Sequence, residues 1–252
     1  MVRYFKDLEF NLPSALLNQL TALFEEMVPG PLTNAALKWV PEEQGVYQLF
    51  FKNKLVYVGK TDADAGLRNR LLRHSKKIRS RLNLNPRDVK FKAVRVYVFT
   101  AMDLEDWLIK YYKDVDGDLE WNLSGFGAND PGRNRDKSEV KEDHFDNKYP
   151  IDLGLSVEVD QGDDRSVANV LRQLKNQLEY TIRFERAGKN SKKAHPELEA
   201  THISLKSRRD AVSEILVQIA QAMGAEWQIT ALSGYVIIYK ENEKYPGGRI
   251  IR

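Results

Sequence analysis

The 252-residue chain contains no cysteine. Disulfide bridges and thiolate metal sites are therefore excluded, and this composition suits a cytoplasmic protein. No run of about 18 apolar residues occurs, so we expect no membrane span. The first residues, MVRYFKDLEFNLPS, lack the apolar core of a signal peptide. The chain also lacks a Gly-rich phosphate loop and a dinucleotide-binding fingerprint.

Positive charge is concentrated in one segment of the chain. The net charge is only +3, but residues 60–95 carry twelve Lys and Arg against three Asp. That segment is therefore +9 and the remainder −6. A local basic stripe favours a polyanionic partner such as nucleic acid, although a solvated helix face gives the same pattern.

The hydrophobic periodicity predicts an α+β protein with a small mixed β-sheet flanked by helices and a C-terminal α+β extension. Helices are expected at 14–27, 66–82, 102–113, 166–175 and 208–223. Strands are expected at 45–51, 55–59, 91–99 and 178–185, with a closing hairpin at 227–240. Thr100 or Asp103 is expected near the start of the third helix. The segment Ser207-Arg208-Arg209-Asp210 resembles a capping box at the start of the fifth.

Four segments describe the expected domain organisation. They are an N-terminal helical segment (1–40), a core (41–123), a Gly-rich polar excursion (124–152) and a C-terminal portion packed with the core (153–252). The excursion shows no clear period, so it is a long loop, a tail or a functional insertion. The C-terminal portion is expected to serve DNA recognition, dimerisation or both.

Two tripeptides at matching places of the first hairpin carry the most specific signal. Gly-Val-Tyr at 45–47 and Tyr-Val-Gly at 57–59 each place a tyrosine next to a strand glycine. Arg70 and His74 follow one turn apart on the next expected helix. Glu105 opens the helix after that, and Asn122 follows in Trp121-Asn122. In this order the residues resemble the GIY-YIG nuclease superfamily.

Longer runs resemble one branch of that superfamily, the Eco-29k-I-like type II restriction endonucleases. These runs are LRNRLLRH (67–74), WNLSGFGANDPGRNRD (121–136), FDNKYPID (145–152), HPEL (195–198) and ALSGYVIIYKE (231–241). The resemblance covers most of the chain from about residue 40. It implies a GIY-YIG nuclease core, a homodimer and a cognate DNA methyltransferase that protects host DNA without forming a stable complex.

The resemblance also implies a role for each candidate catalytic residue. Tyr47 is the general base for water, and Tyr57 hydrogen-bonds the phosphate or the water. Arg70 holds phosphate oxygens through its forked guanidinium. A neutral His74 could accept the proton from Tyr47, with bulk solvent as the alternative acceptor. Glu105 ligates Mg²⁺ or Mn²⁺, which stabilises charge on the phosphate and on the leaving oxygen, and Asn122 orients the site.

The basic residues supply the expected contacts with double-stranded DNA. Candidate phosphate or base contacts are Lys60, Arg68, Arg73, Lys77, Arg79, Arg133 and Arg135. Base readers are expected in the excursion and the C-terminal portion, drawn from Asn129, Arg133, Arg135, Arg208 and Arg209. The recognition sequence is expected to be a palindrome, GC-rich by resemblance, because two sites related by a two-fold axis cut both strands.

Three functions remain open on the sequence alone. The first is a type II restriction endonuclease with one metal ion per active site. The second is a structure-specific or homing nuclease on the same catalytic core. The third is a non-catalytic DNA-binding protein on that scaffold, which the complete set of candidate catalytic residues disfavours.

Overall fold

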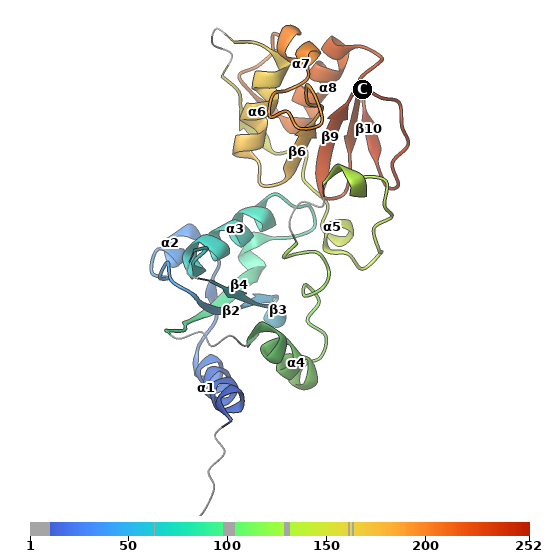
Figure 1. The fold of residues 1–252 in the computed structure, drawn as a ribbon. Coiled ribbons are helices and arrows are strands. Elements are labelled where there is room, and N and C mark those ends of the chain that lie inside the picture. Colours follow the sequence, from blue (N-terminus) through green and yellow to red (C-terminus); the bar gives the residue numbers. More distant parts are fainter. Residues whose placement is uncertain (1–10, 63, 98–103, 129–131, 161, 163) are drawn as a thin grey trace, which may run out of the picture. The chain divides into compact units, whose positions relative to one another are not determined.

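A computed structural model describes residues 11–62, 64–97, 104–128, 132–160, 162 and 164–252. The chain is α+β and divides into two compact units (Figure 1). The N-terminal unit comprises Met1–Ser75 and Asn85–Asn122, and the C-terminal unit comprises Lys76–Leu84 and Leu123–Arg252. Among the helices of the described residues, none combines the length and apolarity needed to cross a bilayer.

The N-terminal unit is built on a four-stranded sheet in the order β1-β4-β2-β3. Its strands are β1 (Gly30–Pro31), β2 (Gly45–Phe51), β3 (Lys54–Thr61) and β4 (Val89–Arg95). Its helices are α1 (Leu12–Glu26), α2 (Asn34–Leu37), α3 (Leu67–Arg79) and α4 (Leu104–Asp116), with α3 continuing past Ser75, and a 3₁₀ turn covers Pro86–Asp88. The expected strands and helices of this unit are therefore confirmed, apart from the expected positions 98–103 (Thr100 and Asp103 among them), which lie outside the described residues.

The prediction of a mixed sheet is wrong for the N-terminal unit. All three strand pairings there are antiparallel. Lys52 and Asn53 form a tight turn between β2 and β3, both with φ above +45°, and so short a turn can only join antiparallel strands. The apolar face formed by Val46 and Val58 packs against α1 and α4, which lie on the same side of the sheet in Figure 1.

The C-terminal unit contains the mixed sheet, in the order β10-β8-β9-β6. Its strands are β6 (Thr181–Phe184), β8 (Gln228–Ala231), β9 (Tyr235–Tyr239) and β10 (Arg249–Ile251), and only β6 and β9 pair in parallel. A two-stranded sheet joins β5 (Ser156–Glu158) to β7 (Arg209–Ala211). The helices are α5 (Phe145–Lys148), α6 (Val167–Gln177), α7 (Pro196–Ala200) and α8 (Val212–Met223), with a 3₁₀ turn at Arg133–Arg135.

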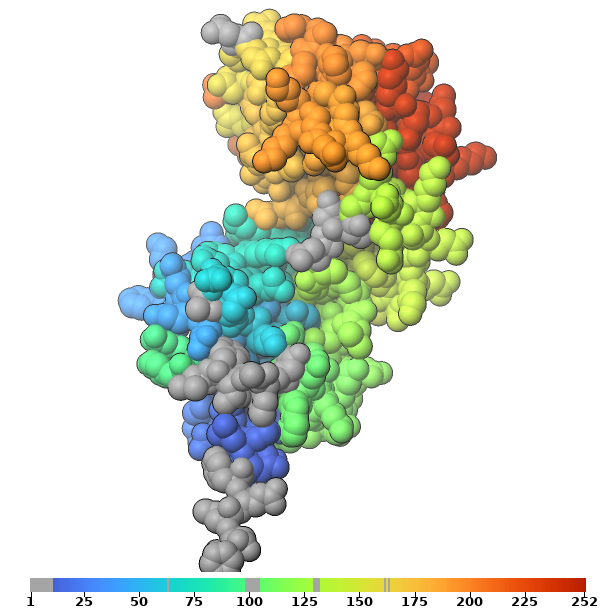
Figure 2. Space-filling model, viewed as in Figure 1, coloured from blue at the N-terminus to red at the C-terminus, as the bar shows by residue number. Residues whose placement is uncertain are grey.

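One apolar core fills the C-terminal unit, and the two faces of β9 divide its contacts. Val236 and Ile238 join the buried side chains of α6 and α8. Tyr235, Ile237 and Tyr239 face the other way and form a second cluster with Leu232 and Tyr245. In the space-filling view of Figure 2, the orange segment near residue 200 covers the visible face of this unit, with yellow and red segments on either side.

The capping box expected at Ser207 is wrong. The Ser207 hydroxyl bonds the backbone of Arg209 in a local turn, and Arg209–Ala211 is strand β7. The helix begins at Val212 after Ala211, which makes no side-chain cap. Pairing with β5 provides backbone partners for 209–211, so the extended conformation replaces the expected first helical turn. The hairpin across Ser233-Gly234 is confirmed, because Leu232 N donates to Tyr235 O at 2.9 Å.

Candidate active site

The hairpin register brings Tyr47 and Tyr57 to one face of the sheet. Tyr47 pairs with Gly59, and Tyr57 pairs with Leu49, so the tyrosines are diagonal neighbours two residues apart in register. Their ring centroids lie 6.0 Å apart. Both side chains are buried, with 0% of Tyr47 and 5% of Tyr57 exposed.

The glycine of each tripeptide leaves room that a side chain would fill. A Cβ atom on Gly59 would lie 2.6 Å from the Tyr47 hydroxyl oxygen and 2.7 Å from the Tyr57 ring. A Cβ atom on Gly45 would lie 2.3 Å from Val94 O and 2.6 Å from Leu67 at the start of α3. Gly59 therefore lets the two phenols lie against the strand, and Gly45 lets the next helix pack closely on the sheet.

Helix α3 brings Arg70 and His74 to the Tyr47 hydroxyl. His74 Nε2 lies 2.8 Å from the Tyr47 hydroxyl oxygen, and Arg70 Nε donates to the same oxygen at 3.4 Å. His74 is buried, with 3% exposed, and its ring centroid lies 5.6 Å from each of the two tyrosine rings. The four predicted residues Tyr47, Tyr57, Arg70 and His74 are thus brought together, from two strands and one helix.

Burial keeps both phenols protonated. Desolvation, aided by the neighbouring Tyr57, raises the pKa of Tyr47 well above its ordinary value, and Arg70 only partly opposes this. Burial also raises the pKa of Tyr57, and the negative charge of Glu105 adds to the effect. Burial alone would lower the pKa of Arg70, but its hydrogen bond to Tyr47 leaves that pKa raised. A Tyr47 hydroxyl in this site keeps its proton at neutral pH, and it can accept a second proton only by passing its own to a neighbour.

Glu105 contributes a carboxylate near this cluster. It lies in the first turn of α4 with Asp106, and its side chain is half-buried. Its electrostatic effect on the Tyr57 pKa relates it to the tyrosine pair. Within the described ranges, no three His, Asp or Glu side chains form a group that could hold a metal by themselves. Glu105 is therefore the predicted metal ligand that the described residues place near the two tyrosines.

Asn122 closes the exposed edge of the sheet. Its Oδ1 accepts from Val58 N at 2.9 Å, and its Nδ2 donates to Val58 O at 2.9 Å. Trp121 N also donates to Val56 O at 2.8 Å. The amide thereby replaces a further strand beside β3 and fixes the backbone next to Tyr57. Through these two hydrogen bonds Asn122 holds the strand that carries Tyr57, which agrees with its predicted orienting role.

The predicted DNA-contacting residues of the N-terminal unit have different environments in the structure. Arg73 is exposed on α3, whereas Lys60 alternates onto the sheet face of Val46 and Val58, opposite Tyr47. Arg68 instead bonds protein groups: it donates to Val40 O at 2.7 Å, Lys38 O at 3.2 Å and the Glu42 carboxylate at 2.6 Å. We therefore leave Arg68 out of the proposed phosphate contacts.

In the C-terminal unit, Lys77 bonds protein groups, whereas Arg79 is exposed. Lys77 donates to Phe126 O at 2.6 Å, and its ammonium lies 5.3 Å and 5.2 Å from the ring centroids of Phe126 and Phe145. Arg79 is exposed at the end of α3. Lys77 therefore holds the Gly-rich excursion, and Arg79 is the better candidate for a phosphate contact.

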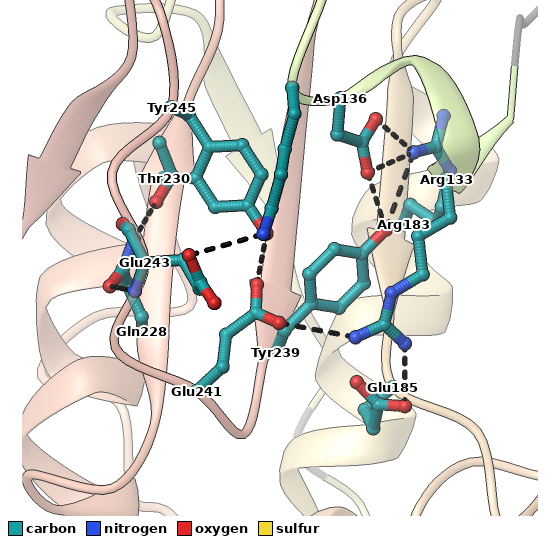
Figure 3. Close-up of polar contacts among 11 residues, drawn as sticks. Arg133, Asp136, Arg183, Glu185, Gln228, Thr230, Tyr239, Glu241, Glu243 and Tyr245 are labelled. Carbon is teal, nitrogen blue, oxygen red and sulfur yellow. Dashed lines mark hydrogen bonds and ion pairs between the residues drawn. The ribbon is translucent and has the colours of Figure 1, made fainter.

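The excursion is anchored by a polar cluster that the sequence did not reveal (Figure 3). Arg133 pairs with Glu185 at 2.8 Å and Glu241 at 3.2 Å, and its guanidinium lies 4.1 Å from the Tyr239 ring centroid. Asp136 is 2% exposed and accepts from Arg183 at 2.5 Å, with further bonds from Tyr235 and Tyr239. Between these two anchors Arg135 stays exposed.

Three further predicted base readers have different outcomes. Asn129 lies outside the described residues. Arg208 pairs with Glu158 at 2.8 Å, and Arg209 donates to Ser156 Oγ at 3.1 Å. These contacts lie on the exposed rim of the β5–β7 sheet. A surface ion pair of this kind is weak enough to exchange for a phosphate. The base contacts expected for Arg208 and Arg209 therefore stay predictions.

Comparison with known proteins does not extend these assignments. No protein-family model matches the chain, and no curated protein matches its sequence.

Proposed function

We propose that the chain is a metal-dependent DNA endonuclease with a GIY-YIG-type catalytic core. The observation that carries the proposal is the Tyr47 hydroxyl, which lies between His74 Nε2 at 2.8 Å and Arg70 Nε at 3.4 Å. A buried phenol with a proton acceptor on one side and a fixed cation on the other suits proton transfer beside a phosphate. The ordered set of Tyr47, Tyr57, Arg70, His74, Glu105 and Asn122 resembles this superfamily.

The proton path follows from the hydrogen bonds of Tyr47. Its hydroxyl donates to His74 Nε2, which requires the tautomer with a free lone pair on that nitrogen. The oxygen accepts from Arg70 at 3.4 Å, and in the proposed path its second lone pair takes the proton of the attacking water. As this water attacks phosphorus, its proton moves to Tyr47 while the phenol proton moves to His74. Because burial disfavours a free phenolate, the two transfers occur together.

Two residues support this path without exchanging protons. Arg70 remains positively charged and directs its guanidinium to phosphate oxygens. Its hydrogen bond to Tyr47 also fixes the phenol. Asn122 holds the Val58 backbone and so positions the strand that carries Tyr57. Asn122 is therefore a positioning residue in this proposal.

The donor set fits Mg²⁺ or Mn²⁺. Mg²⁺ is commonly held by one or two carboxylates together with substrate phosphate and water. Glu105 is the residue that would hold it, and its charge already acts on Tyr57. When bound, the ion would stabilise negative charge on the phosphate and on the leaving oxygen.

Within the nucleases we propose a type II restriction endonuclease that acts on double-stranded DNA as a homodimer. The supporting observation is the resemblance of the GFG-x-x-DPG-x-x-RD run at 125–136 to the Eco-29k-I-like branch. Asp136 and Arg133 of this run bond Arg183 and Glu185, at the end of β6, as recognition by a fixed element requires. A palindromic site is expected for two active sites related by symmetry.

A plasmid digest tests the proposal. The protein is incubated with supercoiled plasmid in Mg²⁺, in Mn²⁺ and in EDTA, with Tyr47→Phe as the matched inactive variant. Discrete fragments that require the metal and Tyr47 support a restriction endonuclease, and sequencing of the ends gives the site. Preferential cleavage of branched duplexes would instead identify a structure-specific nuclease. Tight DNA binding without cleavage in either metal would identify a non-catalytic DNA-binding protein.

A further inference from the structure

Trp39 is presented to solvent in the N-terminal unit. Its exposed fraction is 89%, although tryptophan is usually buried over most of its surface. The residue follows α2 and lies between Lys38 and Val40. An indole placed so fully in water has a large apolar face available for a partner.

The backbone on both sides of Trp39 is held by Arg68. The guanidinium donates to Lys38 O at 3.2 Å and to Val40 O at 2.7 Å, the two carbonyls that flank the tryptophan. A third bond, to Glu42 at 2.6 Å, fixes the guanidinium. Trp39 N also donates to Ala36 O at 3.2 Å. The exposed indole thus projects from a fixed loop, which lowers the entropic cost of binding through it.

The charge around this loop favours a polyanion. Arg68 lies in the first turn of α3, and the N-terminal half of this helix, LRNRLLR, contains three arginines and no acidic residue. Lys38, beside Trp39, is exposed. Glu42 and Glu43 are the acidic neighbours, and they pair with Arg68 and Arg95. An apolar protein surface would match the indole but not this charge, whereas DNA offers both phosphates and base faces.

We propose that Trp39 is a DNA-contacting residue whose indole stacks on a base of the bound DNA. The inference rests on the proposed function and adds a substrate contact to it. Aromatic side chains stack on any unpaired or splayed base, and apolar wedges open base steps in duplexes. Because stacking is indifferent to base identity, Trp39 would set affinity and local DNA shape, leaving sequence choice to other residues.

Binding of a labelled duplex without divalent metal tests the inference. The probe is a mixed-sequence duplex with 2-aminopurine at successive positions, titrated with wild type, Trp39→Ala, Trp39→Phe and the control Trp107→Phe. Trp107 is a second exposed tryptophan, 44% exposed on α4. We expect Trp39→Ala to weaken binding by about 5- to 100-fold and to abolish the 2-aminopurine response, with Trp39→Phe intermediate and the control unchanged.

The outcomes separate this inference from the proposed function. If Trp39→Ala binds within about twofold of wild type, the inference fails, whether or not the protein cuts plasmid. If wild type never cuts but Trp39→Ala loses affinity and the 2-aminopurine response, the nuclease proposal fails and the DNA contact stands. If the variant instead shifts sedimentation from dimer to monomer at unchanged DNA affinity per protomer, a second copy covers Trp39 and the inference is overturned. Circular dichroism of each variant confirms folding.

Discussion

The hydroxyl oxygen of Tyr47 lies 2.8 Å from Nε2 of His74, so the first hairpin strand and the following helix share one buried hydrogen bond. Both groups are almost fully removed from water. A buried polar pair of this kind is costly unless each member satisfies the other. The pair is therefore part of the packing, and in the proposed mechanism the same contact also moves a proton.

Removal of the Tyr47 hydroxyl should separate catalysis from folding. Tyr47→Phe is expected to lower the cleavage rate by about 10²–10⁴, because general acid–base catalysis supplies that much. The free energy of unfolding should fall by only about 1–3 kcal/mol, the cost of leaving His74 without this hydroxyl. Plasmid cleavage and urea unfolding measure the two effects, with exposed Tyr97→Phe as the control. Half the wild-type rate in Tyr47→Phe would remove Tyr47 from the mechanism.

The acid limb of the pH–rate profile should belong to His74. The pKa of Tyr47 is raised, so its phenol stays protonated at neutral pH and cannot produce a limb there. His74 must be neutral to accept the phenol proton, so activity should fall as acid protonates it. We expect His74→Ala to lower the rate and abolish this limb, while exposed His202→Ala keeps it. A limb that survives in His74→Ala would leave His74 a structural residue and make solvent the proton acceptor.

Glu105 should separate DNA binding from cutting. Glu105→Ala is expected to bind its site at least as tightly as wild type, because one negative charge facing phosphate is removed. Cleavage should be undetectable, because the proposed metal ligand is lost. Asp106→Ala, in the same helical turn, controls for the loss of a first-turn acid, which costs about 0.3–1 kcal/mol. A gel shift and a digest on one preparation suffice, and a folded Glu105→Ala protein cutting at wild-type speed would refute the metal assignment.

The addition of a single methyl group at Gly59 should lower the cleavage rate. In Gly59→Ala the new methyl group would lie 2.6 Å from the Tyr47 hydroxyl oxygen, closer than van der Waals contact allows. The phenol must move, so we expect a rate loss of about 10² when reacting groups are misplaced by about 1 Å. Gly188→Ala is the control, because a Cβ atom there meets nothing within 4 Å. Equal rates in the two variants would show that the position of Tyr47 tolerates this shift.

Two basic residues close together in sequence should behave differently in salt. Arg79→Ala is expected to reduce the slope of log K against log salt by up to about one, as the loss of one phosphate contact does. Lys77→Ala should leave the slope unchanged and lower the stability of the C-terminal unit, because Lys77 bonds Phe126 O. Anisotropy titrations at several salt concentrations, with urea unfolding, measure both. The reverse pattern would make Lys77 the phosphate contact and Arg79 a solvated side chain.

Local rules in the sequence determined most of the elements and the placement of Arg70 and His74 on one side of a helix. The alternation of a strand places residues 45, 47 and 49 on one face. The tight turn pairs Phe50 with Leu55, but the register then shifts between Leu49 and Phe50. This irregularity, which the sequence did not reveal, pairs Leu49 with Tyr57 and so brings Tyr57 to the face of Tyr47. Helical periodicity places Arg70 and His74 on one side of α3. These periods depend on neighbours a few residues away, so they could be predicted without knowing the tertiary structure.

Only the tertiary structure decided which basic residues are available to a partner. Arg68, Lys77 and Arg133 look like any other basic residues in the sequence, but protein carbonyls and carboxylates engage them. Asp136 is likewise one acid in a polar run, yet it accepts from Arg183 and two tyrosines in a nearly closed site. A long charged side chain takes whichever opposite charge or carbonyl the folded chain brings within reach, and for Arg133 that group is Glu241, more than one hundred residues away. No local pattern encodes such a pairing, because it exists only after the chain has folded.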